Sequence, residues 1–125
     1  MLFDTDVVIW ALRGNARAAD AIDRADRLDF SVVSYMELLR GALNKTDLRL
    51  TKAFLVDLGF HIVPLTENIG HRASIYLEEY VLKSNLGVPD ALIAATAAEN
   101  ETVLCTGNAK DYRAIADIEI KVFHP

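Results

Sequence analysis

Four acidic residues stand close to the start of predicted helices, and their chemistry suits a divalent metal ion. They are Asp4, Glu37, Asp90 and Asp111. Clustered carboxylates repel one another and their pKa values rise, so a fold that gathers them needs a compensating charge. Hard cations such as Mg²⁺ and Mn²⁺ prefer oxygen ligands and supply that charge. With one or two such ions, the expected chemistry is hydrolysis of a phosphodiester by metal-activated water.

Local structural roles are an alternative explanation for the first two acids. Asp4 follows three apolar residues and precedes a helical pattern, so it suits an N-cap. Thr5 and Asp6 could cap the same helix, which would leave Asp4 free. Glu37 follows Ser34 by three residues, the pattern of a capping box.

The other two acids also have local explanations. Asp90 follows Pro89, and Asp111 follows Asn108 by three residues, so both fall in first helical turns where a negative charge is favoured. The argument for function comes from the combination. The acids lie where a parallel sheet would bring several of them to one edge, and ligands bind outside the carboxyl ends of such strands.

The elements that must position these acids alternate along the chain. Apolar and β-branched runs predict strands over residues 1–3, 28–33, 60–63, 102–106 and 118–123. Helical spacing with capping and stop signals predicts helices over residues 6–13, 16–26, 34–43, 47–58, 67–86, 90–100 and 108–115. This alternation indicates a parallel sheet with helices on both faces.

Composition and charge exclude several classes of protein. At 125 residues the chain predicts one domain, and its 52% hydrophobic residues include no run long enough to cross a membrane. The start lacks the features of a signal peptide, and one cysteine excludes an internal disulfide, so we expect a cytoplasmic protein. The net charge of −5 argues against tight duplex binding. Without the four acids, the rest of the chain carries a net charge of −5 + 4 = −1, which is compatible with an RNA substrate.

Four motifs carry a resemblance to a known family. They are LFDTDVVI at residues 2–9, SYMELLRG at 34–41, VPDALIAATA at 88–97 and TGNAKDY at 106–112. In order, spacing and total length the chain resembles the PIN-domain ribonucleases, in particular the VapC-type toxins of toxin–antitoxin pairs. Tyr112 stands where that family more often has phenylalanine. The resemblance implies a three-layer α/β/α sandwich with a central, mostly parallel sheet, formed by residues 1–125 as a single PIN-like nuclease domain.

The resemblance also implies an activity, a cofactor and partners. The activity would be that of an endoribonuclease dependent on Mg²⁺ or Mn²⁺, acting on RNA as a homodimer and inhibited by a cognate small antitoxin. The catalytic set would be Asp4, Glu37, Asp90 and Asp111, with Asp4 and Asp90 as metal ligands, Glu37 and Asp111 as further candidate ligands, and Thr5, Asp6, Thr106 and Asn108 in support.

Two further predictions concern binding surfaces. Arg40 follows Glu37 by one helical turn, so it could reach a substrate phosphate near the metal. An aliphatic stripe exceeds the needs of one helix face and could form part of a dimer or antitoxin surface. It consists of Leu48, Leu50, Phe54, Leu55 and Leu58.

Three alternatives remain open. A haloacid-dehalogenase-type phosphatase would use Asp4 as nucleophile and Asp6 as acid, but it needs a lysine and paired acids late in the chain. Only the isolated Asp111 and Asp117 are present there, and Glu37 would have no role. A receiver-type signalling module lacks its central acceptor aspartate. An inactive PIN-like binding module is the third alternative, and the complete acid set argues against it.

Overall fold

The computed structural model describes residues 1–125, and its elements alternate as the sequence predicts. In chain order they are β1 (Leu2–Phe3), α1 (Thr5–Leu12), α2 (Ala16–Arg24), β2 (Asp29–Ser31), α3 (Val32–Arg40), α4 (Lys45–Leu58), β3 (His61–Val63), α5 (Glu67–Tyr80), α6 (Val88–Glu99), β4 (Leu104–Thr106), α7 (Ala109–Tyr112) and β5 (Ile120–Val122). No helix among them is both long enough and apolar enough to span a membrane.

Strand β1 lies at the centre of a five-stranded sheet of order β3-β2-β1-β4-β5, in which every pair is parallel. Leu2 is in register with Asp29 on one side and Leu104 on the other. The chain continues outward from β1 in both directions, so the switch point of the topology lies between β1 and β4. Asp4 follows β1 directly and stands at that crevice, where ligands of such sheets bind.

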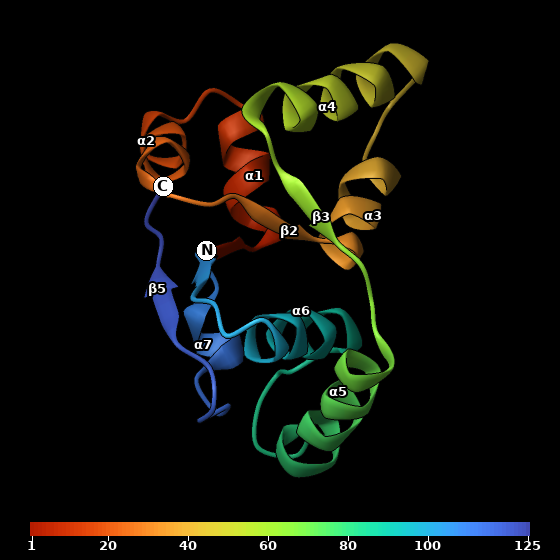
Figure 1. Ribbon diagram of the computed structural model, residues 1–125, viewed down its shortest axis with the longest axis vertical. Helices are drawn as coiled ribbons and strands as arrows, with labels where there is room; N and C mark the ends of the chain where they lie inside the picture. The colour runs from red at the N-terminus through yellow and green to blue at the C-terminus, as the bar shows by residue number, and fades with distance from the viewer.

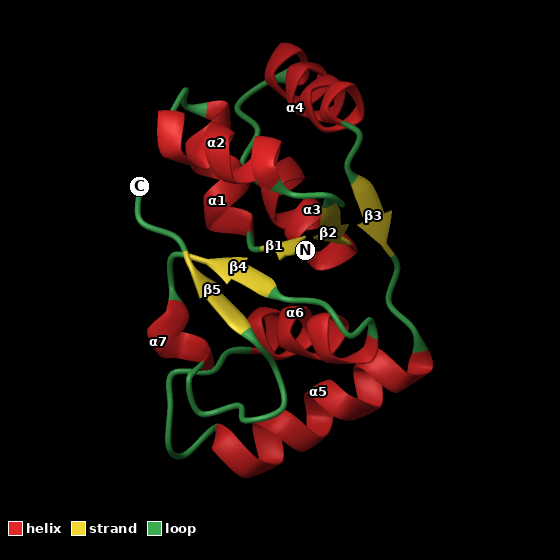
Figure 2. Cartoon of the chain, turned by 60° about the vertical axis from the view of Figure 1, so that its left-hand side comes forward, coloured by secondary structure: helices red, strands yellow, loops and turns green.

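The three layers follow from the alternation of side chains along each strand. Leu2 and Leu104 face the layer of α5, α6 and α7, and belong to a cluster of 14 buried residues. Phe3 and Cys105 face the layer that contains α1 to α4, and belong to a second cluster of 10. Figure 1 shows the two groups of helices on opposite sides of the sheet, and Figure 2 shows the same layers from another side. The predicted three-layer α/β/α sandwich is confirmed, with an all-parallel sheet.

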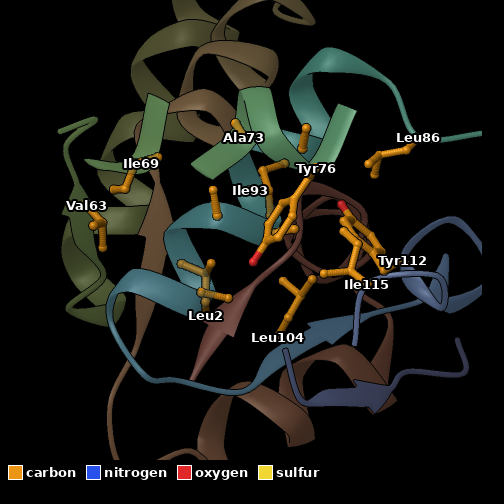
Figure 3. Packing of buried hydrophobic residues seen from close by; sticks show 14 residues of the cluster. Leu2, Val63, Ile69, Ala73, Tyr76, Leu86, Ile93, Leu104, Tyr112 and Ile115 are labelled. Carbon is orange, nitrogen blue, oxygen red and sulfur yellow. The ribbon is translucent and has the colours of Figure 1, made fainter. Parts of the chain in front are cut away.

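Helix α6 has more buried residues than any other helix, and its packing against the sheet holds its first turn in place. Three of its alanines, Ala91, Ala94 and Ala95, are fully buried and allow close approach. Ile93 and Tyr112 fill the space beside them, as Figure 3 shows. A helix that is apolar on nearly every side belongs in a core. Asp90, at its N-terminus, is therefore held by the best-packed part of the molecule.

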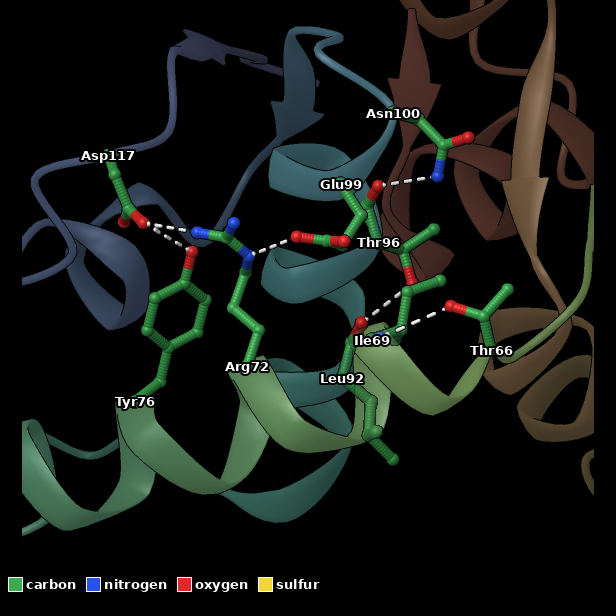
Figure 4. Close-up of polar contacts among 9 residues, drawn as sticks. All are labelled: Thr66, Ile69, Arg72, Tyr76, Leu92, Thr96, Glu99, Asn100 and Asp117. Atoms are coloured by element: carbon green, nitrogen blue, oxygen red, sulfur yellow. Dashed lines mark hydrogen bonds and ion pairs between the residues drawn. The ribbon is translucent and has the colours of Figure 1, made fainter.

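A polar network connects α5, α6 and the loop before β5. The Arg72 guanidinium on α5 donates to Glu99 on α6 at 2.6 Å and to Asp117 in the loop before β5 at 2.8 Å (Figure 4). The Tyr76 hydroxyl donates to the same Asp117 carboxylate at 3.0 Å. These contacts link α5 to the C-terminal end of α6 and to the loop before β5.

Several predicted boundaries differ from the structure by two residues or more. The helix predicted over residues 67–86 ends at Tyr80. There the Ser84 hydroxyl donates to the Tyr80 carbonyl and accepts from the Leu86 amide, so a serine competes with the helical ladder. Helix α3 begins at Val32, two residues before the predicted start. Helix α7 ends at Tyr112, where the prediction extended to residue 115.

Candidate metal centre at the sheet edge

Asp4 is the central acid of the candidate site. It caps α1, its Oδ1 accepting from the Thr5 amide at 2.8 Å. Its Oδ2 accepts from the Thr106 hydroxyl at 2.7 Å and from the Tyr112 hydroxyl at 3.0 Å. Only 5% of the residue is exposed. Burial raises the pKa of Asp4, these hydrogen bonds oppose the rise, and the charge of Glu37 adds to it.

Asp90 reaches the same place from a different layer. It lies in the first turn of α6, after the loop that follows α5, so no strand directly precedes it. Its Oδ1 accepts from the Tyr112 hydroxyl at 3.2 Å, and its Oδ2 accepts weakly from the Gly87 amide at 3.4 Å. Burial raises the pKa of Asp90, and the charges of Asp4 and Asp111 raise it further.

Tyr112 joins these two carboxylates through one oxygen atom. Its side chain is fully buried, and its hydroxyl lies within hydrogen-bond distance of both Asp4 and Asp90. A hydroxyl has one proton, so it donates to one carboxylate at a time. Burial and the two neighbouring charges raise the pKa of Tyr112 far above its usual value, which keeps the phenol protonated. Sequence reasoning assigned this residue no role, because only an aromatic residue was expected there.

Glu37 approaches Asp4 from α3. The Thr5 hydroxyl donates to its Oε1 at 2.8 Å. The predicted capping box with Ser34 is wrong, because Ser31 caps the helix through a bond from the Val33 amide at 3.1 Å. Ser34 lies inside the helix, and its buried Oγ has no hydrogen-bond partner. Glu37 therefore has no capping role, and its side chain turns toward the site.

Asp6 forms the other wall of the site, against the turn after β4. Its Oδ2 accepts from the Gly107 amide at 2.9 Å and from the Asn108 side-chain amide at 3.5 Å, and its buried Oδ1 has no partner. A Cβ at Gly107 would lie 2.5 Å from this carboxylate, so the close approach requires glycine. Burial and the charge of Asp4 raise the pKa of Asp6 to about 6. The Asn108 amide donates to the Thr106 hydroxyl, which orients that hydroxyl toward Asp4.

Asp111 and Arg40 lie farther from the centre. Asp111 is half-buried on α7 and makes no hydrogen bond to the other acids, but its charge contributes to the raised pKa of Asp90. Arg40 is exposed in the last turn of α3 and forms no ion pair. Its contact with a substrate phosphate stays a prediction.

The donor set fits a hard divalent cation. No three Asp, Glu, His or Cys side chains come close enough to bind one ion by themselves. Mg²⁺ nevertheless keeps several waters and needs only one or two carboxylates together with substrate phosphate. Asp4 and Asp90 provide such a pair. Burial raises the pKa values of Asp4, Asp6 and Asp90, and the charges of neighbouring acids add to the rise. None of the three acids forms an ion pair with a lysine or arginine.

The aliphatic stripe predicted on α4 is not a continuous surface. Leu55 is buried in the second cluster, and Phe54 and Leu58 pack against it. Leu50 is the exposed member, with 59% of its surface accessible. The stripe is thus largely a core contact, because α4 covers the outer side of its layer.

Comparison with known proteins agrees with this architecture. The family profile of the PIN domain matches residues 1–118. No curated protein matches the chain in sequence.

Several solved structures share the fold. A chain from a toxin–antitoxin complex of Klebsiella pneumoniae is 30% identical, with a TM-score of 0.79 over 94% of this chain and 93% of that one. A chain of VapBC-1 from nontypeable Haemophilus influenzae is 22% identical, with a TM-score of 0.83 over 97% and 96%. A chain of DNA-bound VapBC2 from Rickettsia felis is 16% identical, with a TM-score of 0.83 over 98% of each.

Proposed function

The chain belongs to the PIN-domain family, and from that premise we propose that it is a metal-dependent endoribonuclease of the VapC toxin type. The observation that carries the proposal is the meeting of Asp4 and Asp90 at one phenol oxygen, at the carboxyl edge of the central strand. These residues come from different layers, and the core holds both in place. Helix capping would explain each acid by itself, but it does not explain why the two carboxylates meet, whereas a shared cation does.

Asp4 and Asp90 would hold Mg²⁺ or Mn²⁺. When bound, the cation supplies an activated water and neutralises charge that develops on the phosphate. Glu37, held by the Thr5 hydroxyl, and Asp111 would orient water or a second, weaker ion. Thr106 fixes the Asp4 carboxylate, while Asn108 orients Thr106 and helps to fix Asp6.

The substrate would be single-stranded or loop RNA. Its backbone can enter a narrow acidic crevice with the bases turned outward. A duplex would need a broad basic face, which a chain of net charge −5 lacks.

An antitoxin would bind beside this site, in a groove of about 480 Å³ between α1, α3 and α4. Apolar residues line it, including Leu12, Leu38 and Leu43, and 89% of Leu43 is exposed. Glu37 lines the same groove, so an occupant would reach the edge of the catalytic site. The similarity to a chain of a toxin–antitoxin complex supports this partner. We also propose a homodimer, which sedimentation at micromolar concentration would show.

The test of activity separates the nuclease from the phosphatase alternative. Purified protein is incubated with a structured RNA and with p-nitrophenyl phosphate, each with Mg²⁺ and with EDTA. We expect Mg²⁺-dependent RNA cleavage that Asp4→Asn reduces by a factor of at least about 100. Monoester turnover with intact RNA, and equal damage from Asp6→Asn and Asp4→Asn, would instead support the phosphatase.

A further inference from the structure

A basic pocket lies next to the acidic site, and sequence reasoning did not identify it. It has a volume of about 560 Å³, and two segments far apart in the sequence line it. One is the loop between α5 and α6, and the other is α7 with the two residues that follow it (Figure 2). Its polar and charged residues are Lys83, Ser84, Asn85, Lys110, Asp111 and Arg113.

The cations of this pocket have no partner within the chain. The ion pairs of the protein involve Arg24, Arg27 and Arg72. Lys83, Lys110 and Arg113 are exposed and form none of them. One carboxylate, Asp111, lines the pocket with these three cations, so the pocket is positive on a chain of net charge −5.

The position of the pocket relative to the acids indicates its ligand. Asp111 lines the pocket, and its charge also acts on Asp90. Lys110 and Arg113 flank Asp111 and Tyr112, and the Tyr112 hydroxyl contacts both Asp4 and Asp90. The basic pocket therefore adjoins the acidic centre along the same edge of the molecule.

We propose that this pocket binds the phosphate backbone of the RNA strand beside the bond that is cut. This inference rests on the proposed function. Lysine and arginine side chains bind phosphate through charge-assisted hydrogen bonds, and exposed Asn85 could contact a ribose hydroxyl. The volume suits one or two nucleotides. Acids that would repel the backbone at the metal centre are thus balanced by cations in the adjoining pocket.

The test compares two charge-matched triple variants in an Asp4→Asn background, which holds RNA without cutting it. The pocket variant is Lys83→Gln with Lys110→Gln and Arg113→Gln. The control is Lys45→Gln with Arg49→Gln and Lys52→Gln, three exposed cations on α4 at the opposite end of the molecule (Figure 1). Fluorescence anisotropy in Mg²⁺ measures binding of a labelled 12-nucleotide RNA from 50 mM to 1 M KCl.

We expect the pocket variant to reduce the slope of log K against log salt by about 2, since each single-strand phosphate contact contributes about 0.7. Because this range of salt spans about 1.3 log units, that change of slope corresponds to a loss of affinity of about 400-fold at 50 mM KCl relative to 1 M. The control should lose less than about threefold, because α4 lies at the opposite end of the molecule and salt screens the interaction between distant exposed charges. Circular dichroism melts establish that both variants fold.

Three outcomes would overturn the proposal. One is an equal effect of the two triple variants, which would indicate a general charge effect. The second is that the pocket variant loses binding to duplex DNA of the same sequence as much as it loses binding to the RNA. The third is displacement of the RNA by millimolar inorganic phosphate; either of these last two would indicate a non-specific anion site. Cleavage by the parent chain is measured separately. Cleavage with no effect of the pocket variant refutes the pocket alone, whereas selective binding without cleavage refutes the nuclease alone.

Discussion

Replacing Tyr112 with phenylalanine removes one oxygen atom from between two carboxylates and leaves the ring in place. The hydroxyl lies 3.0 Å from Asp4 Oδ2 and 3.2 Å from Asp90 Oδ1. The ring packs in the 14-residue cluster beside Ile115, and Tyr112→Phe preserves that packing (Figure 3). The change therefore isolates the polar contact.

The expected magnitude follows from what each carboxylate loses. Asp4 Oδ2 keeps its bond from Thr106, while Asp90 Oδ1 keeps no other hydrogen bond. One hydroxyl proton makes one charge-assisted bond at a time, worth about 1.5–3 kcal/mol. We expect Tyr112→Phe to lower the unfolding free energy of the metal-free protein by about 2 kcal/mol. For a domain of this size, this lowers Tm by roughly 6–10 °C.

Urea denaturation at pH 7.5, in EDTA and in 10 mM MgCl2, measures the effect. A cation bound by Asp4 and Asp90 would neutralise both carboxylates. In Mg²⁺ the difference in unfolding free energy between Tyr112→Phe and the parent should therefore fall below about 1 kcal/mol. Tyr76→Phe is the matched control, because Tyr76 is also buried and donates to a carboxylate, Asp117, outside the site. Its effect should be the same with and without metal.

Two results would refute this reasoning. If Tyr112→Phe is as stable as the parent in EDTA, the hydroxyl does not support the carboxylates. If the loss is the same in Mg²⁺ as in EDTA, the two carboxylates do not share a cation.

Three further changes test other parts of the site. Asp90→Asn should raise the Tm of the metal-free protein by a few degrees, because burial and neighbouring charges disfavour the ionised form of Asp90. It should also abolish the rise of Tm on adding Mg²⁺. A loss of stability with an intact metal response would identify Asp90 as a cap alone. The pKa of Asp6 is raised to about 6, so the stability that its protonated form contributes is present below the unfolded value near 3.8 and is lost as pH rises through 6. Urea melts in EDTA at pH 5, 6 and 7 should show this decline, and Asp6→Asn should flatten it; parallel profiles would contradict the assignment. Arg40→Ala should raise KM for RNA about threefold to tenfold with little change in kcat, and a fall in kcat alone would exclude a role in binding.

Local sequence determined the order of the elements and the class of fold. The apolar run before Asp4, the helical spacing after it and the stop signals between elements predicted alternating strands and helices. Parallel pairing follows from that alternation, because a helix between two strands returns the chain to the same edge of the sheet. The position of Asp4 at the carboxyl end of β1 was predictable for the same reason.

Boundaries were less predictable where side chains compete with the backbone for hydrogen bonds. Ser31, not Ser34, caps α3. Ser84 binds the Tyr80 carbonyl and the Leu86 amide, so the predicted helix does not continue to residue 86. Serine suits both a cap and a turn, so its type does not decide which of several serines acts.

Only the tertiary structure decided which groups meet. The hydroxyl of Tyr112 contacts Asp4 across 108 positions and Asp90 across 22. Lys83 and Arg113 share a pocket because a loop and a short helix fold side by side. Such contacts leave no periodic signal in the sequence, since they depend on how layers pack and not on the spacing of residues within one element. The sequence therefore indicated the acids of the candidate site, while packing supplied the phenol between two of them and the cations beside them.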